Sequence, residues 1–310
     1  MDSSTFEFRP LTTDEHPLAL DLWGAVFDVG RAYFERYYDS DPLYIPGDTI
    51  GAWHGNLLVS AVHLCRRPVT WKHGSSLLCG GIANVGTLPE YRRLGLSRQL
   101  LTNLIARMES IGVHFSTLGT DVPGHYARLG WEPMEISSIE LSIQSRGENV
   151  GNSRRHESDV IVLQSLYQAT PRPFQLERPT AYFESWVDKY WRKSKGEKLV
   201  IPNKGYAIII SPLEGSGGGS ISEFRAIDYD SELEVLSAAI NAFGSFVKTV
   251  HMPALPQFVA LTDLHMIETV AVKPKPGVMV RNVNLIADDY AAVSSAFVSG
   301  EAVWWPADAF

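Results

Sequence analysis

The stretch NVGTLPEYRRLGLSRQLL, residues 84–101, joins a β-like run to a helix through a short basic turn. After Gly95, apolar residues recur at helical spacing on one face until Gly112, where the helix is expected to end. They are Leu96, Leu100, Leu101, Leu104, Ile105, Met108 and Ile111. The first N–H groups of a helix have no intrahelical partner and carry partial positive charge, so they attract anions. The stretch therefore predicts an anion site between a strand and an amphipathic helix.

The residues of this turn suit a phosphate group. Leu94 to Arg98 supply backbone N–H groups, and Gly95 lets a bulky anion approach the backbone closely. Arg92 and Arg93 add positive charge at the same end of the helix. A helix that is simply well capped, with solvated arginines, is the alternative that this string leaves open by itself.

The hydrophobic pattern around the turn predicts an α+β unit. Strands are expected at residues 6–12, 49–71 (two strands around a turn at 54–56), 75–88, 113–121 and 131–143, and helices at 14–27, 31–38 and 96–111. The polar segment 144–159 is typical of a linker, and beyond it the order of helices and strands partly repeats. The repeat contains no second strand–Arg–Gly–helix turn.

A chain of 310 residues is long for one core, so two domains are expected. We predict a first domain at 1–145, a second at 155–280 and a C-terminal tail at 281–310. The tail ends in Trp304, Trp305, Pro306 and Phe310, which are costly to leave in water. We therefore expect it to be anchored and to pack back on the active site.

Charge and cysteine content limit the expected partners. With 35 acidic residues against 27 Lys and Arg, the chain lacks the positive field of a nucleic-acid or anionic-membrane binder. It shows no secretory signal and no run long enough to span a bilayer, so a cytoplasmic protein is expected. Cys65 and Cys79 flank an expected hairpin tip at residues 72–74, and we expect cross-strand neighbours with reduced thiols. Two thiols without clustered histidines predict no structural metal.

Two motifs together resemble the GNAT superfamily of acetyl-CoA-dependent N-acetyltransferases. Arg92-Arg93-Leu94-Gly95-Leu96-Ser97 matches the family signature Arg/Gln-x-x-Gly-x-Gly/Ala, with Ser97 as a departure. Tyr126-Ala127-Arg128-Leu129-Gly130-Trp131 matches the later Tyr-x-x-x-Gly-Phe/Tyr element. The resemblance covers residues 6–143 and implies a mixed central sheet flanked by helices, with acetyl-CoA as co-substrate. A second, degenerate unit and a terminal Phe resemble, more narrowly, the enhanced-intracellular-survival (Eis) acetyltransferases with a shortened C-terminal part.

The resemblance also implies roles for particular residues. The coenzyme A contacts would come from Val85, Gly86, Thr87, Arg92, Arg93, Leu94, Gly95, Leu96, Ser97 and Arg98. Tyr126 would be the general acid that protonates the coenzyme A thiolate, and a packed core tyrosine is the alternative. The terminal carboxylate of Phe310 would be the base for the incoming ammonium, and a purely structural tail is the alternative. His125 is a second candidate proton carrier.

Aromatic residues of the first two expected helices either line an amine site or belong to the core. They are Trp23, Phe27, Tyr33, Phe34, Tyr37 and Tyr38. Asp28 and Glu35 are weaker candidates for attracting an ammonium group. The function that we expect is acetyl transfer to a primary amine of a small molecule. A protein-lysine acetyltransferase and a non-catalytic acyl-CoA-binding module are the alternatives, and a homo-oligomer is left open.

Overall fold

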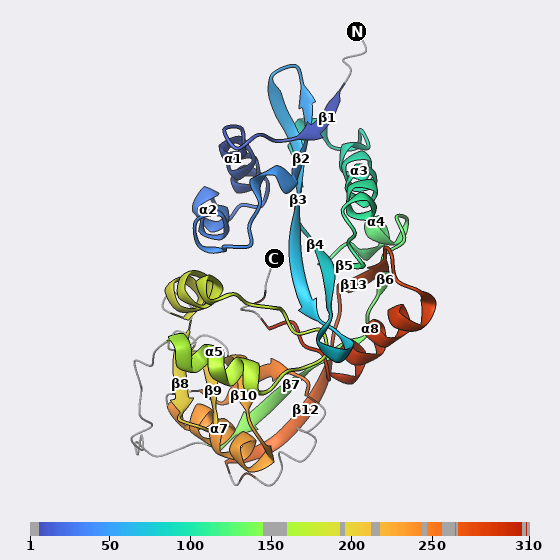
Figure 1. The fold of residues 1–310 in the computed structure, drawn as a ribbon. Helices are drawn as coiled ribbons and strands as arrows, with labels where there is room; N and C mark the ends of the chain where they lie inside the picture. The colour runs from blue at the N-terminus through green and yellow to red at the C-terminus, as the bar shows by residue number, and fades with distance from the viewer. Residues whose placement is uncertain are drawn as a thin grey trace. The chain divides into compact units, whose positions relative to one another are not determined.

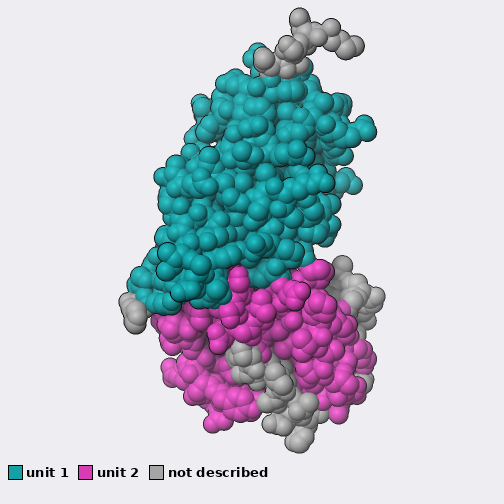
Figure 2. Space-filling model, turned by 90° about the vertical axis from the view of Figure 1, so that its right-hand side faces the viewer, with its two compact units in different colours: residues 1–134, 277–292, 310 teal, residues 135–276, 293–309 magenta. Residues whose placement is uncertain are grey.

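The computed structural model describes residues 6–144, 160–192, 196–211, 218–243, 247–255, 264, 266–305 and 308. They form two compact units, which are coloured separately in Figure 2. The first unit contains the chain up to residue 134 together with residues 277–292. The second contains residues 135–276 and 293–309. Among the described residues, no helix combines the length and apolar character needed to cross a membrane.

The first unit is built on a seven-stranded mixed sheet (Figure 1). Its strand order is β1 (Glu7–Pro10), β2 (Thr49–His54), β3 (Leu57–Thr70), β4 (Ser76–Thr87), β5 (Phe115–Gly119), β13 (Val278–Asn282) and β6 (Glu132–Pro133). Neighbouring strands are antiparallel except β4 and β5, which run parallel. Its helices are α1 (His16–Val26), α2 (Arg31–Ser40), α3 (Leu96–Ser110) and α4 (Pro123–Ala127), with short 3₁₀ turns η1 (Pro46–Asp48), η2 (Lys72–Gly74) and η3 (Pro89–Tyr91).

Helices cover both faces of this sheet, with α1 and α2 on one side and α3 on the other (Figure 1). Ala61 and Val62 are neighbours in β3 but belong to different hydrophobic clusters, because successive strand side chains point to opposite faces. Val62 packs in the cluster with the leucines of α3, and Ala61 packs in the cluster with Trp23 of α1. Each large apolar side chain buried in this way stabilises the fold by about 1.5–3 kcal/mol.

Strand β13 lies between β5 and β6, although it comes from far along the chain. Val280 is opposite Thr117 on one side and Glu132 on the other. Arg281 of β13 donates a hydrogen bond to the carbonyl oxygen of Leu129, and its guanidinium lies over the ring of Trp131. A late strand thus completes the first sheet.

The second unit has a six-stranded mixed sheet. Its strand order is β12 (Ile267–Lys275), β7 (Ile136–Ile143), β11 (Thr249–Pro253), β10 (Gly219–Ala226), β9 (Gly205–Ile210) and β8 (Glu197–Ile201). Its helices are α5 (Val160–Ala169), the π-helical η4 (Tyr182–Arg192) and α7 (Tyr229–Ala242), and α8 (Ala287–Ser299) contributes residues to both units. Strands β10 and β11 are parallel and joined through α7, just as β4 and β5 are joined through α3. Two related units with mixed sheets, as the sequence predicts, are therefore present.

The observed units differ from the predicted boundaries of 1–145, 155–280 and 281–310. Strand β7 alternates between buried and half-buried residues, and its buried side chains Ile139, Leu141 and Ile143 pack in the core of the second unit. Strand β13 pairs within the first unit, so residues 277–292 separate from the rest of the expected tail. Both differences arise from long-range strand pairing, which a local hydrophobic pattern does not specify.

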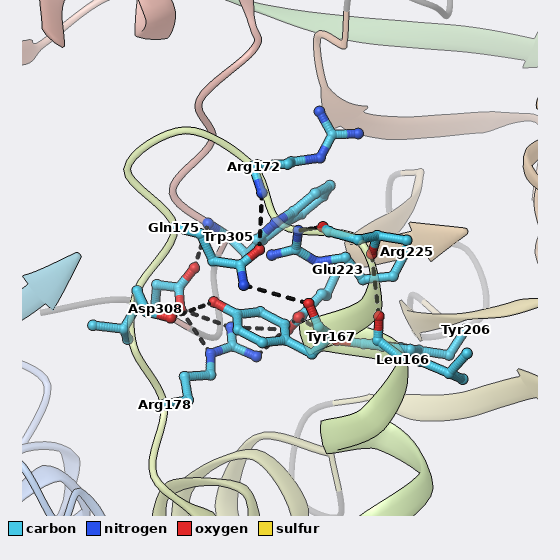
Figure 3. A network of polar contacts seen from close by, with 12 residues as sticks. Leu166, Tyr167, Arg172, Gln175, Arg178, Tyr206, Glu223, Arg225, Trp305 and Asp308 are labelled. Carbon is cyan, nitrogen blue, oxygen red and sulfur yellow. Dashed lines mark hydrogen bonds and ion pairs between the residues drawn. The ribbon is translucent and has the colours of Figure 1, made fainter. Parts of the chain in front are cut away.

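A buried polar network fixes the end of the second unit (Figure 3). The guanidinium of Arg178 donates to Glu223 at 2.9 and 3.1 Å and to Asp308 at 2.7 and 2.9 Å. The hydroxyl of Tyr206 donates to Glu223 at 2.6 Å. Trp305 is 1% exposed, and its backbone N–H donates to Asp308 at 3.1 Å. The chain is thus anchored as far as residue 308.

Candidate active site

Strands β4 and β5 separate part-way along their length. Their parallel pairing covers only Cys79–Gly81 and Phe115–Thr117, although both strands continue beyond these residues. The β3–β4 register also shifts between Ala61 and His63, opposite Asn84. Asn84 has φ of +56°, which marks a bulge in β4 beyond the last residue that pairs with β5, while Gly86 and Thr87 stay paired with β3. The end of β4 is therefore left without β5 as a partner.

A cavity of about 580 Å³ occupies the region where the two strands have separated. It is lined by Phe27, Val29, Tyr33, Phe34, Ile82, Ala83, Asn84, Val85, Gly119, Thr120, Asp121, Val122 and Tyr126. The loop after β5 is held by β13, because the N–H of Thr120 donates to the carbonyl oxygen of Gly277 at 2.8 Å. A Cβ atom at Gly277 would lie only 2.3 Å from the carbonyl oxygen of Thr120, so this close approach requires glycine. We call this space the acceptor cavity, after the acceptor amine that the sequence resemblance leads us to expect beside the aromatic residues of α1 and α2.

The residues of the predicted anion site lie at the start of α3. Gly95 is its N-cap with φ of +80°, and no side chain caps the helix there. A Cβ atom at Gly95 would meet nothing within 4 Å, so the backbone at this point is open to a ligand. Arg93 also has a positive φ, of +65°, and the exposed Leu94 follows it. The geometry suits a phosphate on the N–H groups of this turn.

The remaining predicted coenzyme contacts divide into exposed and packed residues. Arg92 donates through Nε to the carbonyl oxygen of Thr87 at 3.2 Å, which ties the turn to the end of β4. Leu96 is buried, so only its backbone is available to a ligand, whereas Arg98 is exposed. The side chain of Ser97 lies 3.4 Å from the imidazole Nε2 of His125.

Val85, Gly86 and Thr87 occupy the part of β4 beyond the bulge. Val85 lines the acceptor cavity. The hydroxyl of Ser60 donates to the carbonyl oxygen of Gly86 at 2.8 Å. It also lies 2.7 Å from the hydroxyl of Thr87, and these contacts hold the segment against β3.

Sequence comparison decides the family of this unit. Residues 7–134 match the family model described as an acetyltransferase (GNAT) domain. The first unit is a GNAT acetyltransferase domain. No curated protein gives a significant sequence match.

Solved structures show that the similarity of fold extends beyond this GNAT domain. A GCN5-related N-acetyltransferase from Kribbella flavida aligns with a TM-score of 0.66 at 18% identity, over 90% of this chain and 71% of that one. A probable N-acyltransferase from Enterococcus faecalis V583 aligns at 0.70 and 19%, over 91% and 73%. Eis1 from Mycobacterium abscessus aligns at 0.66 and 16%, over 94% and 76%. The fold of both units is thus shared with GNAT proteins, including an Eis protein.

Tyr126 of the GNAT domain lies in the wall of the acceptor cavity. Its side chain is 8% exposed and makes edge-to-face contacts with the rings of His125 and Trp131. Burial raises the pKa of Tyr126, and a hydrogen bond from Thr120 opposes this effect. The hydroxyl therefore keeps its proton at neutral pH. His125 has a lowered pKa because of burial and the nearby Arg98 and Arg128, so it is neutral there.

The aromatic residues of α1 and α2 divide between the cavity and the core. Phe27, Tyr33 and Phe34 line the acceptor cavity, as one of the two interpretations predicts. Trp23 is fully buried, and Tyr38 stacks on His16. Glu35 forms an ion pair with Arg31 at 2.6 Å. Asp28 does not line the cavity, so neither acid offers a free carboxylate to an ammonium there.

The sequence did not single out the loop after β5 as part of the wall. Thr120, Asp121 and Val122 form this loop, opposite the bulge at Asn84. The string GTDVPG around these loop residues, with a glycine before and a proline after, is a turn signal that marks the end of β5. No comparable signal marks the bulge, because Asn84 lies inside an apolar run that reads as continuous strand.

The helix that corresponds to α3 in the second unit has a different start. The side chain of Asp228 caps α7 by accepting from the backbone N–H of Ser231 at 2.8 Å. Asp230 and Glu232 add negative charge in the first turn. A capped, acidic helix start repels a phosphate, which agrees with the missing basic turn in this part of the sequence.

The second predicted catalytic residue, Phe310, lies outside the described residues. Asp308, an alternative carboxylate near the chain end, is 1% exposed. Its two oxygens already accept hydrogen bonds, one from Arg178 and one from Trp305. Asp308 is therefore a structural anchor. In the described part of the chain, no cluster of His, Cys, Asp or Glu is arranged to hold a metal ion.

Proposed function

We propose that the protein transfers an acetyl group from acetyl-CoA to a primary amine of a small molecule, in the acceptor cavity of the GNAT domain. One observation carries this proposal. The uncapped start of α3, the end of β4 that lacks β5 as a partner and the hydroxyl-bearing Tyr126 all border or adjoin the same strand separation. These three features match the three parts of acetyl-CoA in order. The anion site suits the pyrophosphate, the strand end suits the pantetheine arm, and the proton donor suits the thioester.

The coenzyme would be held by the main chain more than by side chains. Its pyrophosphate lies on the N–H groups of Leu94–Arg98, with Arg92 and Arg93 adding charge. Its pantetheine arm follows Val85–Thr87, where β4 has no β5 partner. Backbone groups on the side of this strand end that lacks β5 are available for hydrogen bonds to the amides of this arm. The thioester then lies in the cavity.

The transfer itself needs little covalent chemistry from the protein. The neutral amine attacks the thioester carbonyl, the carbon–sulfur bond breaks, and Tyr126 donates its proton to the departing thiolate. The ammonium proton goes to a base, for which we propose the terminal carboxylate of Phe310. Holding the two reactants together supplies a large part of the rate, because effective molarities of oriented reactants are high.

A concave cavity with aromatic walls favours a small-molecule acceptor. Phe27, Tyr33 and Phe34 present rings to the space, and such rings bind the apolar body of an amine or its cation. One carboxylate, that of Asp121, belongs to the wall, and it is exposed to solvent.

The test is acetyl transfer measured on a panel of small primary amines and one lysine-containing peptide. Thiol release and mass spectrometry of the product are followed with acetyl-CoA in excess. We expect acetylated small amines and no acetylated peptide. Acetylation of the peptide alone would replace our proposal with protein-lysine acetylation. Acetyl-CoA binding without any product would leave an acyl-CoA-binding module.

A further inference from the structure

Four of the residues that line the acceptor cavity are large apolar residues that remain exposed to solvent. They are Phe27, Val29, Tyr33 and Val122, which are 41%, 50%, 38% and 62% exposed. Exposed apolar residues scattered singly over a protein surface are ordinary, whereas several that gather in one place mark a binding surface. Because these four residues both line the cavity and reach solvent, they form its rim, which we call the apolar rim.

The apolar rim continues into an aromatic wall inside the cavity. The ring of Phe34 is only 3% exposed and contacts the rings of Phe27 at 5.7 Å and Tyr33 at 5.1 Å between centroids. A Cβ atom at Gly86 would lie 3.5 Å from the ring of Phe27, so this ring lies against the β4 segment that we propose for the pantetheine arm. An acceptor that reaches the thioester would therefore have apolar surface beside it out to the solvent.

The wall offers little to a second charged group of the acceptor. The guanidinium of Arg36 already lies over the ring of Tyr33, 3.4 Å from its centroid, and it repels a further cation there. Among the lining residues that the structure describes, the carboxylate is that of Asp121, which is exposed. An exposed ion pair changes an affinity by about fivefold at most. Two fully buried methylene groups change it by about fifteenfold, so apolar contact outweighs this charge.

We propose that the apolar rim selects acceptors whose amino group is carried by a long apolar chain or by an aromatic ring. The amine reaches the thioester in the cavity, while its apolar part stays against the rim. Contact between the two removes apolar surface of both from water, and this is the source of the selectivity. The inference rests on the proposed function and adds to it the chemical class of the acceptor, which is an amphipathic monoamine.

The experiment measures acetyl transfer to straight-chain primary amines from propylamine to hexylamine. Burial of one methylene group is worth about fourfold in binding, and about twofold where half of it stays in water. The wild-type protein is therefore expected to gain at least about eightfold in kcat/KM over the three added methylene groups. The gain should appear in KM rather than in kcat, because contacts away from the reacting atoms bind substrate and transition state equally.

Two pairs of valines provide a matched comparison. In Val29→Thr/Val122→Thr each rim side chain keeps its shape but exchanges a methyl group for a hydroxyl, and the gain is expected to fall to about threefold or less. Val298→Thr/Val272→Thr is the control. These two valines are 49% and 63% exposed, close to the values of the rim pair, and they do not line the cavity. The control is expected to keep the wild-type gain, and thermal melting verifies that both proteins are folded.

Hexane-1,6-diamine has the chain of hexylamine with a second ammonium group, and it separates the effect of the rim from that of Asp121. We expect hexylamine to be preferred by at least about tenfold in kcat/KM, because the second ammonium group leaves water only at a cost. A preference for the diamine, equal kcat/KM values along the series, or the full gain in the rim variant would overturn the proposed selectivity while acetyl transfer stands. If none of these amines is acetylated, the proposed function and the selectivity fall together.

Discussion

Arg178 and Asp308 form a buried ion pair although 130 positions separate them in the chain. Their side chains are 0% and 1% exposed, and Nη2 of the arginine lies 2.7 Å from Oδ1 of the aspartate. The same guanidinium also pairs with Glu223, so one cation compensates two buried carboxylates. The pair links the last described residue of the chain to the core of the second unit (Figure 3).

Replacing Arg178 is expected to destabilise the second unit strongly. Arg178→Ala leaves Glu223 and Asp308 buried without their shared partner, and breaking a buried pair in this way costs about 3–5 kcal/mol. Urea unfolding followed by tryptophan fluorescence measures the loss. Lys204→Ala is the control. Lys204 pairs with Glu234, both side chains are 46% exposed, and exposed ion pairs contribute only about 0–1 kcal/mol. Similar losses in both variants would contradict the role given to the network.

The stability of the GNAT domain should fall on mild acidification because of His16. This residue is fully buried, and burial lowers its pKa from 6.5 to about 4. Between these two values the unfolded chain binds a proton that the folded chain does not, so stability falls as pH falls from about 6.5 to 4. At pH 5 the loss relative to pH 8 is about 2 kcal/mol. His16→Gln should show a smaller loss, and NMR titration of His16 near 6.5 would refute the prediction.

The basic turn and the α3 helix could be predicted from the sequence because their signals are local. The leucines of α3 recur at helical spacing, Gly95 adopts the left-handed conformation at its start, and Gly112 does so after its end. The hairpin between β3 and β4 is also confirmed, with Thr70 opposite Ser76. Cys65 and Cys79 both face the interior as free thiols, but each is paired two residues away from the other, opposite Gly81 and Arg67.

Pairings between distant segments could not be predicted in this way. Strand β13 joins the first sheet, and β7 joins the second, because of partners that lie far away in sequence. The buried ion pair of Asp41 and Arg67 is hidden for a similar reason. Asp41 follows α2 while Arg67 comes from β3, and only the fold brings the two side chains together. A buried polar residue within an apolar run gives no sign of which partner will satisfy it.

Removing the hydroxyl of Tyr126 tests its proposed role as general acid. Tyr126→Phe is expected to lower kcat by about 10²–10⁴-fold with nearly unchanged acetyl-CoA affinity, because only the proton donor is lost. Tyr290→Phe is the control, since the pKa of Tyr290 is also raised, to about 12, but this residue does not line the acceptor cavity. A lower melting temperature with normal turnover in Tyr126→Phe would show that the ring serves packing instead.

The chain end gives a separate prediction for the base. Adding one glycine after Phe310 moves the terminal carboxylate, while the anchor at Asp308 stays intact. We expect this extension, or deletion of Phe310, to abolish transfer without lowering the melting temperature or acetyl-CoA affinity. Full activity of the extended chain would reject the terminal carboxylate as base and leave the tail a structural role.

Calorimetric binding of acetyl-CoA to two matched glycine variants tests the account most directly. Gly95 and Gly112 lie at opposite ends of α3, have φ of +80° and +75°, and would each place a Cβ atom in open space. Glutamate at either position thus brings the same charge and similar backbone strain, but only Gly95→Glu puts them at the proposed pyrophosphate site. We predict that Gly95→Glu loses at least about a hundredfold in acetyl-CoA affinity and that Gly112→Glu binds like the wild type. Wild-type affinity in a folded Gly95→Glu protein would contradict the assignment of acetyl-CoA to this turn.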